Sequence, residues 1–124
     1  MTYRKLIYIV DDEQDMLALT TQYLESLGYD VMTFTQGHEA LAAVETSKRP
    51  VSLVLTDMVM PNMTGTSLIT LLKTRVPSMR IVLMTGFFDQ SIVKELIQET
   101  GVPLLKKPFT LEQLGTLVKQ VLAE

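Results

Sequence analysis

The stretch "VSLVLTDMVMPNMTGTSLITLLKTR" (51–75) contains one complete strand, loop and helix. Residues 51–57 form an apolar run that ends on Asp57, which predicts a buried strand with a carboxylate at its carboxyl end. The loop after it contains proline, asparagine and glycine, and the following segment repeats leucine at helical spacing, which predicts an inward face made of Leu68, Leu71 and Leu72. A buried carboxylate without a partner is costly, so Asp57 must cap a helix, face water or meet another group.

The same unit recurs along the chain. Apolar runs predict strands at 5–10, 30–34, 51–57, 80–85 and 102–106. The expected helices are one that ends before Gly28, then 37–48, 66–75, 89–100, and one from a capping box at 110–113 to Leu122. Because strands that alternate with helices require right-handed crossovers, the pattern predicts a doubly wound α/β domain with a parallel sheet covered on both faces.

Helical spacing also predicts which side chains face the core. The first helix is expected to bury Met16, Leu19, Tyr23, Leu24 and Leu27. The fourth helix is expected to bury Ile92, Val93, Leu96 and Ile97. Phe109 stands just before the last helix, where it is expected to pack onto Leu114 as a hydrophobic staple.

Length, charge and composition exclude several classes of protein. The 124 residues amount to one domain, predicted to span 1–124. A net charge of −3 and a pI near 5.1 argue against a direct nucleic-acid partner, which would require a clustered basic face. The absence of cysteine excludes disulfides and thiolate metal sites. Together with short apolar runs and no secretory signal, this composition predicts a cytoplasmic protein without a membrane partner.

Polar residues follow the predicted strands at their carboxyl ends, where doubly wound folds bind ligands. These residues are Asp11, Asp12, Asp57, Thr85 and Lys107. Three neighbouring carboxylates repel one another, and one lysine does not neutralise them, so a divalent cation is expected. Mg²⁺ suits a site with few carboxylates and a phosphate to share. Zinc is not expected, because the single histidine, His38, lies on a predicted helix and is interpreted as solvated.

With a metal ion beside it, Asp57 could act as a nucleophile toward phosphorus. Phosphoryl transfer depends on positioning and charge neutralisation, which Mg²⁺, the Lys107 ammonium, the Thr85 hydroxyl and backbone N–H groups would supply. The sequence has no GxxxxGK[ST] motif, no GxGxxG after the first strand and no Ser/His/Asp arrangement. ATP is therefore not the expected phosphoryl donor.

Four motifs resemble one known family. "VDDE" (10–13), "LTDMVMPNMTG" (55–65), "MTG" (84–86) and "KKPF" (106–109) occur in the order found in the receiver domain of two-component response regulators. The resemblance implies a (βα)5 flavodoxin-like sandwich whose five-stranded parallel sheet has the order 2-1-3-4-5.

The resemblance also implies a role for each site residue. Asp57 would be the phosphoacceptor, Asp12 would bind Mg²⁺ directly, Asp11 would support the ion partly through water, and the backbone carbonyl of Val59 would complete the ligands. Thr85 and Lys107 would contact the phosphoryl oxygens. Strand alternation only weakly separates Lys106 from Lys107, but the family pattern selects Lys107, whose peptide bond to Pro108 is typically cis in the family.

The implied partners are a histidine kinase or histidine phosphotransfer protein as donor, and a downstream protein or fused output domain. The domain would carry out only phosphotransfer to itself and autodephosphorylation. Thr85 and Leu104 would form the switch, although the family commonly has an aromatic residue where Leu104 stands. A homodimer could form through the fourth helix, fifth strand and fifth helix. Val59 and Phe87 are apolar where polar residues often tune hydrolysis, which predicts a long-lived aspartyl phosphate.

Other interpretations remain open. Taken singly, Asp11 and Asp12 could cap a helix, Asp57 could face solvent, Thr85 could be structural and Lys107 could be solvated. The methionines read as adaptable packing. A receiver-like interaction module without phosphorylation is one alternative function. An aspartyl-phosphate hydrolase is another, although that class places a second aspartate where Val59 stands. The sequence leaves open whether the chain is a stand-alone regulator or the receiver of a hybrid kinase.

Overall fold

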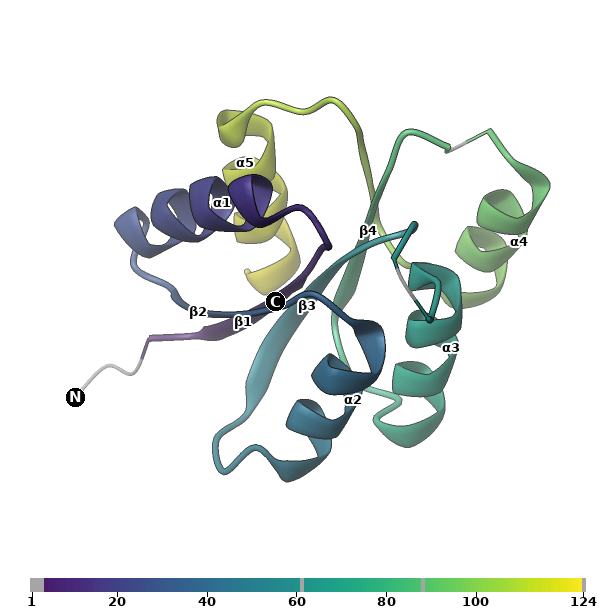
Figure 1. Ribbon diagram of the computed structural model, residues 1–124, viewed down its shortest axis with the longest axis horizontal. Helices are drawn as coiled ribbons and strands as arrows, with labels where there is room; N and C mark the ends of the chain where they lie inside the picture. The colour runs from purple at the N-terminus through teal and green to yellow at the C-terminus, as the bar shows by residue number, and fades with distance from the viewer. Residues whose placement is uncertain (1–3, 61, 88, 124) are drawn as a thin grey trace.

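The computed structural model describes residues 4–60, 62–87 and 89–123 and shows five strands that alternate with five helices (Figure 1). The strands are β1 (Leu6–Val10), β2 (Asp30–Phe34), β3 (Val51–Asp57), β4 (Ile81–Thr85) and β5 (Leu104–Lys106). The helices are α1 (Gln14–Ser26), α2 (Gly37–Thr46), α3 (Gly65–Arg75), α4 (Ser91–Thr100) and α5 (Leu111–Leu122). All strand pairs are parallel and the order is β2-β1-β3-β4-β5, so the predicted doubly wound fold is confirmed.

Two helices cover one face of the sheet and three cover the other. In Figure 1, α1 and α5 lie together on one side, and α2, α3 and α4 lie on the opposite side. The core is divided in the same way: Ile7 and Ile9 of β1 pack with α1 and α5, while Tyr8 and Val10 pack with α2, α3 and α4. Every residue of β1 is buried, as expected for a central strand covered on both faces.

A nearby proline shortens two of the predicted elements. The last strand was predicted from residue 102, but Pro103 has no N–H to donate and β5 begins at Leu104. The second helix was predicted to reach residue 48, but α2 ends at Thr46. Ser47 is already extended there, and its hydroxyl donates to the carbonyl of Arg49 before Pro50.

The predicted start of the last helix and the predicted end of the fourth helix are confirmed. Thr110 and Gln113 form a capping box at the start of α5, with the Thr110 Oγ1 accepting from the Gln113 N–H at 3.0 Å. Gly101 ends α4 in the left-handed conformation, with φ of 69°. Phe109 packs in the same hydrophobic cluster as Leu114, as the staple predicts.

Two predicted core positions are wrong. Leu19 of α1 is 50% exposed and Ile92 of α4 is 53% exposed. In α1 the buried face instead consists of Leu17, Thr20 and Leu24. Thr20 can occupy this face because its hydroxyl donates to the carbonyl of Met16, one turn earlier, at 2.7 Å. In α4 the buried pair is Val93 and Leu96.

Candidate functional site

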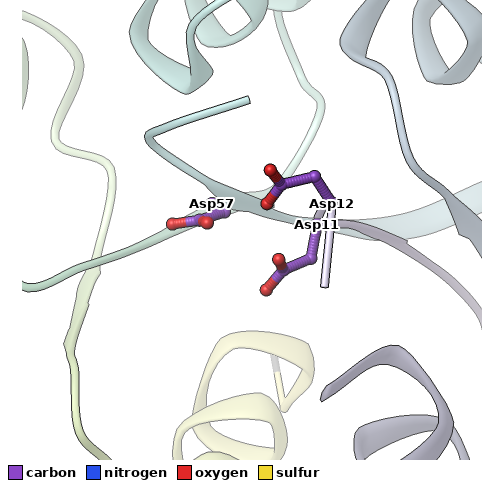
Figure 2. A group of neighbouring side chains, drawn as sticks. All are labelled: Asp11, Asp12 and Asp57. Atoms are coloured by element: carbon purple, nitrogen blue, oxygen red, sulfur yellow. The ribbon is translucent and has the colours of Figure 1, made fainter. Parts of the chain in front are cut away.

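The predicted site residues meet at the carboxyl edge of the sheet, next to the reversal in winding between β1 and β3. Asp11 directly follows β1, Asp57 is the last residue of β3 and Thr85 is the last residue of β4. Lys107 directly follows β5. Figure 2 shows the carboxylates of Asp11 and Asp12 directed toward the side on which Asp57 lies, at the end of the neighbouring strand. The fold therefore brings together residues that are almost 100 positions apart, as the strand-end argument predicts.

The three aspartates form a compact acidic group. Each offers one carboxylate oxygen, and these oxygens lie within 4.8 Å of one another. Asp11 is fully buried and Asp57 is 8% exposed, whereas Asp12 faces solvent. The Glu13 N–H donates to Asp11 Oδ1 at 3.0 Å, and the Met58 N–H donates to Asp57 Oδ1 at 2.8 Å. Backbone donors therefore orient the two buried carboxylates.

Lys107 bridges the two buried carboxylates. Its Nζ lies 3.3 Å from Asp11 Oδ2 and 3.3 Å from Asp57 Oδ2. Its backbone N–H donates to the Thr85 carbonyl at 3.0 Å, which anchors the residue to the end of β4. Lys106 is an exposed residue of β5, so Lys107 is the lysine that enters this cluster. The Lys107–Pro108 peptide bond is cis.

The pKa values of Asp57 and Lys107 reflect this crowding. Burial raises the pKa of Asp57 above its ordinary 3.8, the Lys107 charge lowers it, and the Asp11 charge raises it again. Burial acts to lower the pKa of Lys107, but the charges of Asp57 and Asp11 outweigh it, and the net pKa is raised. The cluster thus keeps the Lys107 ammonium charged, while the Asp57 carboxylate carries a desolvation cost.

Thr85 is buried, with 1% exposure, and its hydroxyl makes two contacts. Its Oγ1 accepts a hydrogen bond from the Phe87 N–H at 2.9 Å and donates to the sulfur of Met58 at 3.6 Å. Sequence reasoning treated Met58 as packing only. The residue type gave no signal for this contact, because it depends on how the end of β3 lies beside the end of β4.

Gly65 is a second residue whose importance the sequence did not reveal. It appeared only as a turn former, but α3 begins at Gly65 directly above the end of β3. A Cβ on this residue would lie 2.1 Å from the Asp57 carbonyl oxygen and 2.9 Å from Met58 Cα. The Gly65 N–H donates to the Met58 carbonyl at 2.8 Å. Only glycine permits this close approach of two backbone segments.

The remaining predicted residues surround this cluster. The side chains of Val59 and Phe87 are 56% and 49% exposed in the two loops that follow β3 and β4. Leu104 is half-buried on β5 and packs against the core beneath α2, α3 and α4. His38 is exposed near the start of α2, in agreement with its interpretation as a solvated residue.

The donor chemistry fits a hard divalent cation. Asp11, Asp12 and Asp57 supply carboxylate oxygens, and Lys107 offsets only part of their charge. Oxygen ligands of this kind, with one exposed carboxylate open to water, match what Mg²⁺ requires.

Comparison with known proteins identifies the family. A sequence profile described as "Response regulator receiver domain" matches residues 7–119. The chain belongs to the response regulator receiver family. Receiver domains of this family are generally signalling domains and not enzymes acting on separate substrates.

Individual relatives support the assignment to the receiver family. The response regulator receiver protein CpdR of Brucella abortus (strain 2308) is 31% identical over 118 residues, which cover 95% of this chain and 97% of that protein. Sensor kinase CckA of the same organism is 32% identical over 116 residues, covering 94% of this chain and 12% of the kinase. A crystal structure of a CheY-like receiver domain protein from Methanospirillum hungatei JF-1 matches with a TM-score of 0.89 and 30% identity, covering 98% and 95% of the two chains.

The receiver domain matches only part of several longer relatives. It spans 12% of the sensor kinase and 25% of the NtrC transcriptional regulators, for example that of Salmonella typhimurium. Within the part of the chain that the structure describes, no helix combines the length and apolar character needed to cross a membrane.

Proposed function

We propose that this receiver, spanning residues 1–124, accepts a phosphoryl group on Asp57 and thereby switches a surface that binds a partner. The observation that carries the proposal is the position of Lys107 Nζ, 3.3 Å from both Asp57 Oδ2 and Asp11 Oδ2. A lysine shared between two buried carboxylates places a fixed positive charge where phosphoryl oxygens would develop negative charge. A carboxylate that merely faced solvent at the end of a strand would not require a lysine shared with a second buried carboxylate.

Each step of the transfer has a residue to perform it. One carboxylate oxygen of Asp57 attacks phosphorus, and the P–N bond of a donor phosphohistidine breaks, so that the imidazole leaves with its electron pair. The Lys107 ammonium and the Thr85 hydroxyl bind the phosphoryl oxygens and offset their charge. Water then hydrolyses the aspartyl phosphate, which returns Asp57 to the carboxylate and releases inorganic phosphate, so the domain acts only on itself.

Mg²⁺ would be held by the carboxylates of Asp11, Asp12 and Asp57 and by the backbone carbonyl of Val59. When bound, the ion supplies charge neutralisation for the incoming phosphoryl group. The acidic group supports this assignment because its oxygens already lie within 4.8 Å of one another while Lys107 supplies a single compensating charge.

The proposed donor is a histidine kinase or histidine phosphotransfer protein, and the proposed recipient of the signal is a downstream protein or a fused output domain. Phosphorylation would favour one of two arrangements of Thr85 and Leu104, and so change the face formed by α4, β5 and α5. This face could also mediate a homodimer. We propose a cytoplasmic location and no direct contact with nucleic acid.

Intact-mass measurement after incubation with acetyl phosphate and Mg²⁺ tests the proposal. We expect the parent protein to gain the mass of one phosphoryl group, and the gain to disappear with EDTA or in the Asp57→Asn variant. Asp89→Asn is the matched control, because Asp89 is an exposed aspartate in the β4–α4 connection and should leave the gain intact. Undiminished phosphorylation of Asp57→Asn would refute the assignment of the acceptor. No phosphorylation of the parent would favour an interaction module, and turnover of added phosphoesters would favour a hydrolase.

A further inference from the structure

The Thr85 hydroxyl uses its proton and one of its two lone pairs on two neighbouring groups. The Phe87 N–H donates to Thr85 Oγ1 at 2.9 Å, so one lone pair of the oxygen is used. The hydroxyl proton is directed at the Met58 sulfur, 3.6 Å from Oγ1. In this arrangement the proton is committed to sulfur and is not offered to a group bound at Asp57.

Met58 is linked to the site through three other contacts. Its N–H donates to Asp57 Oδ1 at 2.8 Å and to the Met84 carbonyl at 3.2 Å. Its carbonyl accepts from the Gly65 N–H at 2.8 Å. The backbone of Met58 is therefore fixed between β3, β4 and α3, and its side chain is half-buried in the core next to Thr85.

We propose that Met58 is a positioning residue whose sulfur holds the Thr85 hydroxyl away from Asp57 until a phosphoryl group arrives. This inference rests on the proposed function of Thr85 as a ligand of the phosphoryl oxygens. The backbone contacts of Met58 orient the acceptor carboxylate, while its thioether controls the second group that the reaction needs. Met58 thus links the Asp57 carboxylate to the Thr85 hydroxyl.

The chemistry of sulfur suits a contact that must be released. A thioether is a weak acceptor, whereas a phosphoryl oxygen carries charge and accepts strongly. The Thr85 hydroxyl therefore donates its hydrogen bond to the Met58 sulfur when the site lacks a phosphoryl group, and to a phosphoryl oxygen when one is present. An acceptor stronger than sulfur would hold the hydroxyl longer, and no acceptor would leave it free.

Two variants of similar side-chain volume separate this role from packing. Met58→Leu removes the acceptor, and Met58→Gln replaces it with a stronger one. We expect Leu to accelerate phosphorylation by acetyl phosphate and Gln to slow it, each by about two- to tenfold, the range of one net hydrogen bond. A residue that only fills space would give changes in the same direction for both variants.

The Phe87 amide provides a second readout that does not depend on phosphorylation, because its N–H donates to Thr85 Oγ1. Its ¹H–¹⁵N resonance should shift in opposite directions in the Leu and Gln variants. Met60→Leu is the matched control: it removes another sulfur of the same loop, which contacts Thr56 Oγ1 at 3.9 Å, and should leave the Phe87 resonance in place. In a Thr85→Val background, Met58→Leu should have no further effect on either readout.

The outcomes of the two readouts are distinguishable. The role of Met58 would be overturned if the Phe87 resonance and the phosphorylation rate changed in the same direction in Met58→Leu and Met58→Gln. It would also be overturned if Met58→Leu still changed either readout in the Thr85→Val background. If the parent protein takes up no phosphoryl group, the proposed function fails. The Phe87 resonance then still decides whether the Met58 sulfur sets the position of the Thr85 hydroxyl.

Discussion

Replacing Gly65 by alanine should damage both the fold and the proposed phosphoacceptor site. The new Cβ would lie 2.1 Å from the Asp57 carbonyl oxygen and 2.9 Å from both Asp57 C and Met58 Cα. Ordinary contacts between such atoms are about 3.5 Å, so the backbone at the end of β3 or the start of α3 must move by roughly 1 Å. These atoms belong to the main chain, and no side chain can rotate away to relieve the contact.

The expected loss of stability follows from this overlap. Overpacking typically costs about 1–3 kcal/mol, and alanine returns about 0.4–1 kcal/mol by restricting the unfolded chain. With an overpacking cost in the middle of its range, about 2 kcal/mol, the net destabilisation should be about 1–1.6 kcal/mol. For 124 residues the entropy of unfolding is about 0.26 kcal/mol per kelvin, so the melting temperature should fall by roughly 4–6 °C. Because a misplacement of about 1 Å can cost about 100-fold in rate, phosphorylation should fall at least tenfold.

Thermal unfolding by circular dichroism and intact-mass phosphorylation kinetics measure the two effects. Gly86→Ala is the matched control, since a Cβ there meets its nearest neighbour, the Lys107 carbonyl oxygen, at an ordinary 3.7 Å. This control should melt at or slightly above the parent temperature. If Gly65→Ala melts within about 1 °C of the parent and phosphorylates at the parent rate, the close approach does not constrain the site.

Three further predictions concern charge, hydrolysis and helix capping. Because burial raises the pKa of Asp57, the folded protein holds that proton more tightly than the unfolded chain, and stability is lost as pH rises from 3.8 through the raised value. As pH rises through that window in Mg²⁺-free buffer, the unfolding free energy of Asp57→Asn should therefore increase relative to that of the parent. A difference between the two unfolding free energies that does not change with pH would contradict this. Val59→Asn and Phe87→Asn should shorten the aspartyl phosphate lifetime, measured by the decay of phosphorylated mass, and equal decay would count against shielding by these side chains. Thr110→Ala should lower the unfolding free energy by about 1 kcal/mol, measured by thermal unfolding, because it removes the N-cap of α5. Replacing the exposed Thr116 by alanine is the control and should not cause this loss.

The strand ends could be predicted because topology alone determines them. Parallel strands in a doubly wound sheet present all their carboxyl ends at one edge, so Asp57, Thr85 and Lys107 had to approach one another once the strands were recognised. The sequence could not decide firmly between Lys106 and Lys107, since a strand of three residues offers little alternation. In the structure, Lys107 is the lysine that contacts Asp11 and Asp57.

Helix faces were harder to predict because a polar residue can occupy a core position. Thr20 is 2% exposed in α1, and its hydroxyl donates to the carbonyls of Met16 and Leu17. The prediction used only apolar residues, so it included Leu19 in the buried face of α1 and left out Thr20, which shifts part of the predicted face by one position. A threonine whose hydroxyl donates to a carbonyl of its own helix can occupy a core position, because its buried polar group keeps a hydrogen-bond partner.

The contacts of Met58 and Gly65 could not be predicted for a different reason. Both depend on the path of the β3–α3 loop, which brings the start of α3 back within hydrogen-bond distance of the residue after Asp57. Hydrophobic periodicity and motif spacing describe which element a residue occupies, but not how closely two backbones pass. The Asp57 carboxylate is therefore recognisable in the sequence, whereas the residues that contact it and the Thr85 hydroxyl become visible only through distances between atoms.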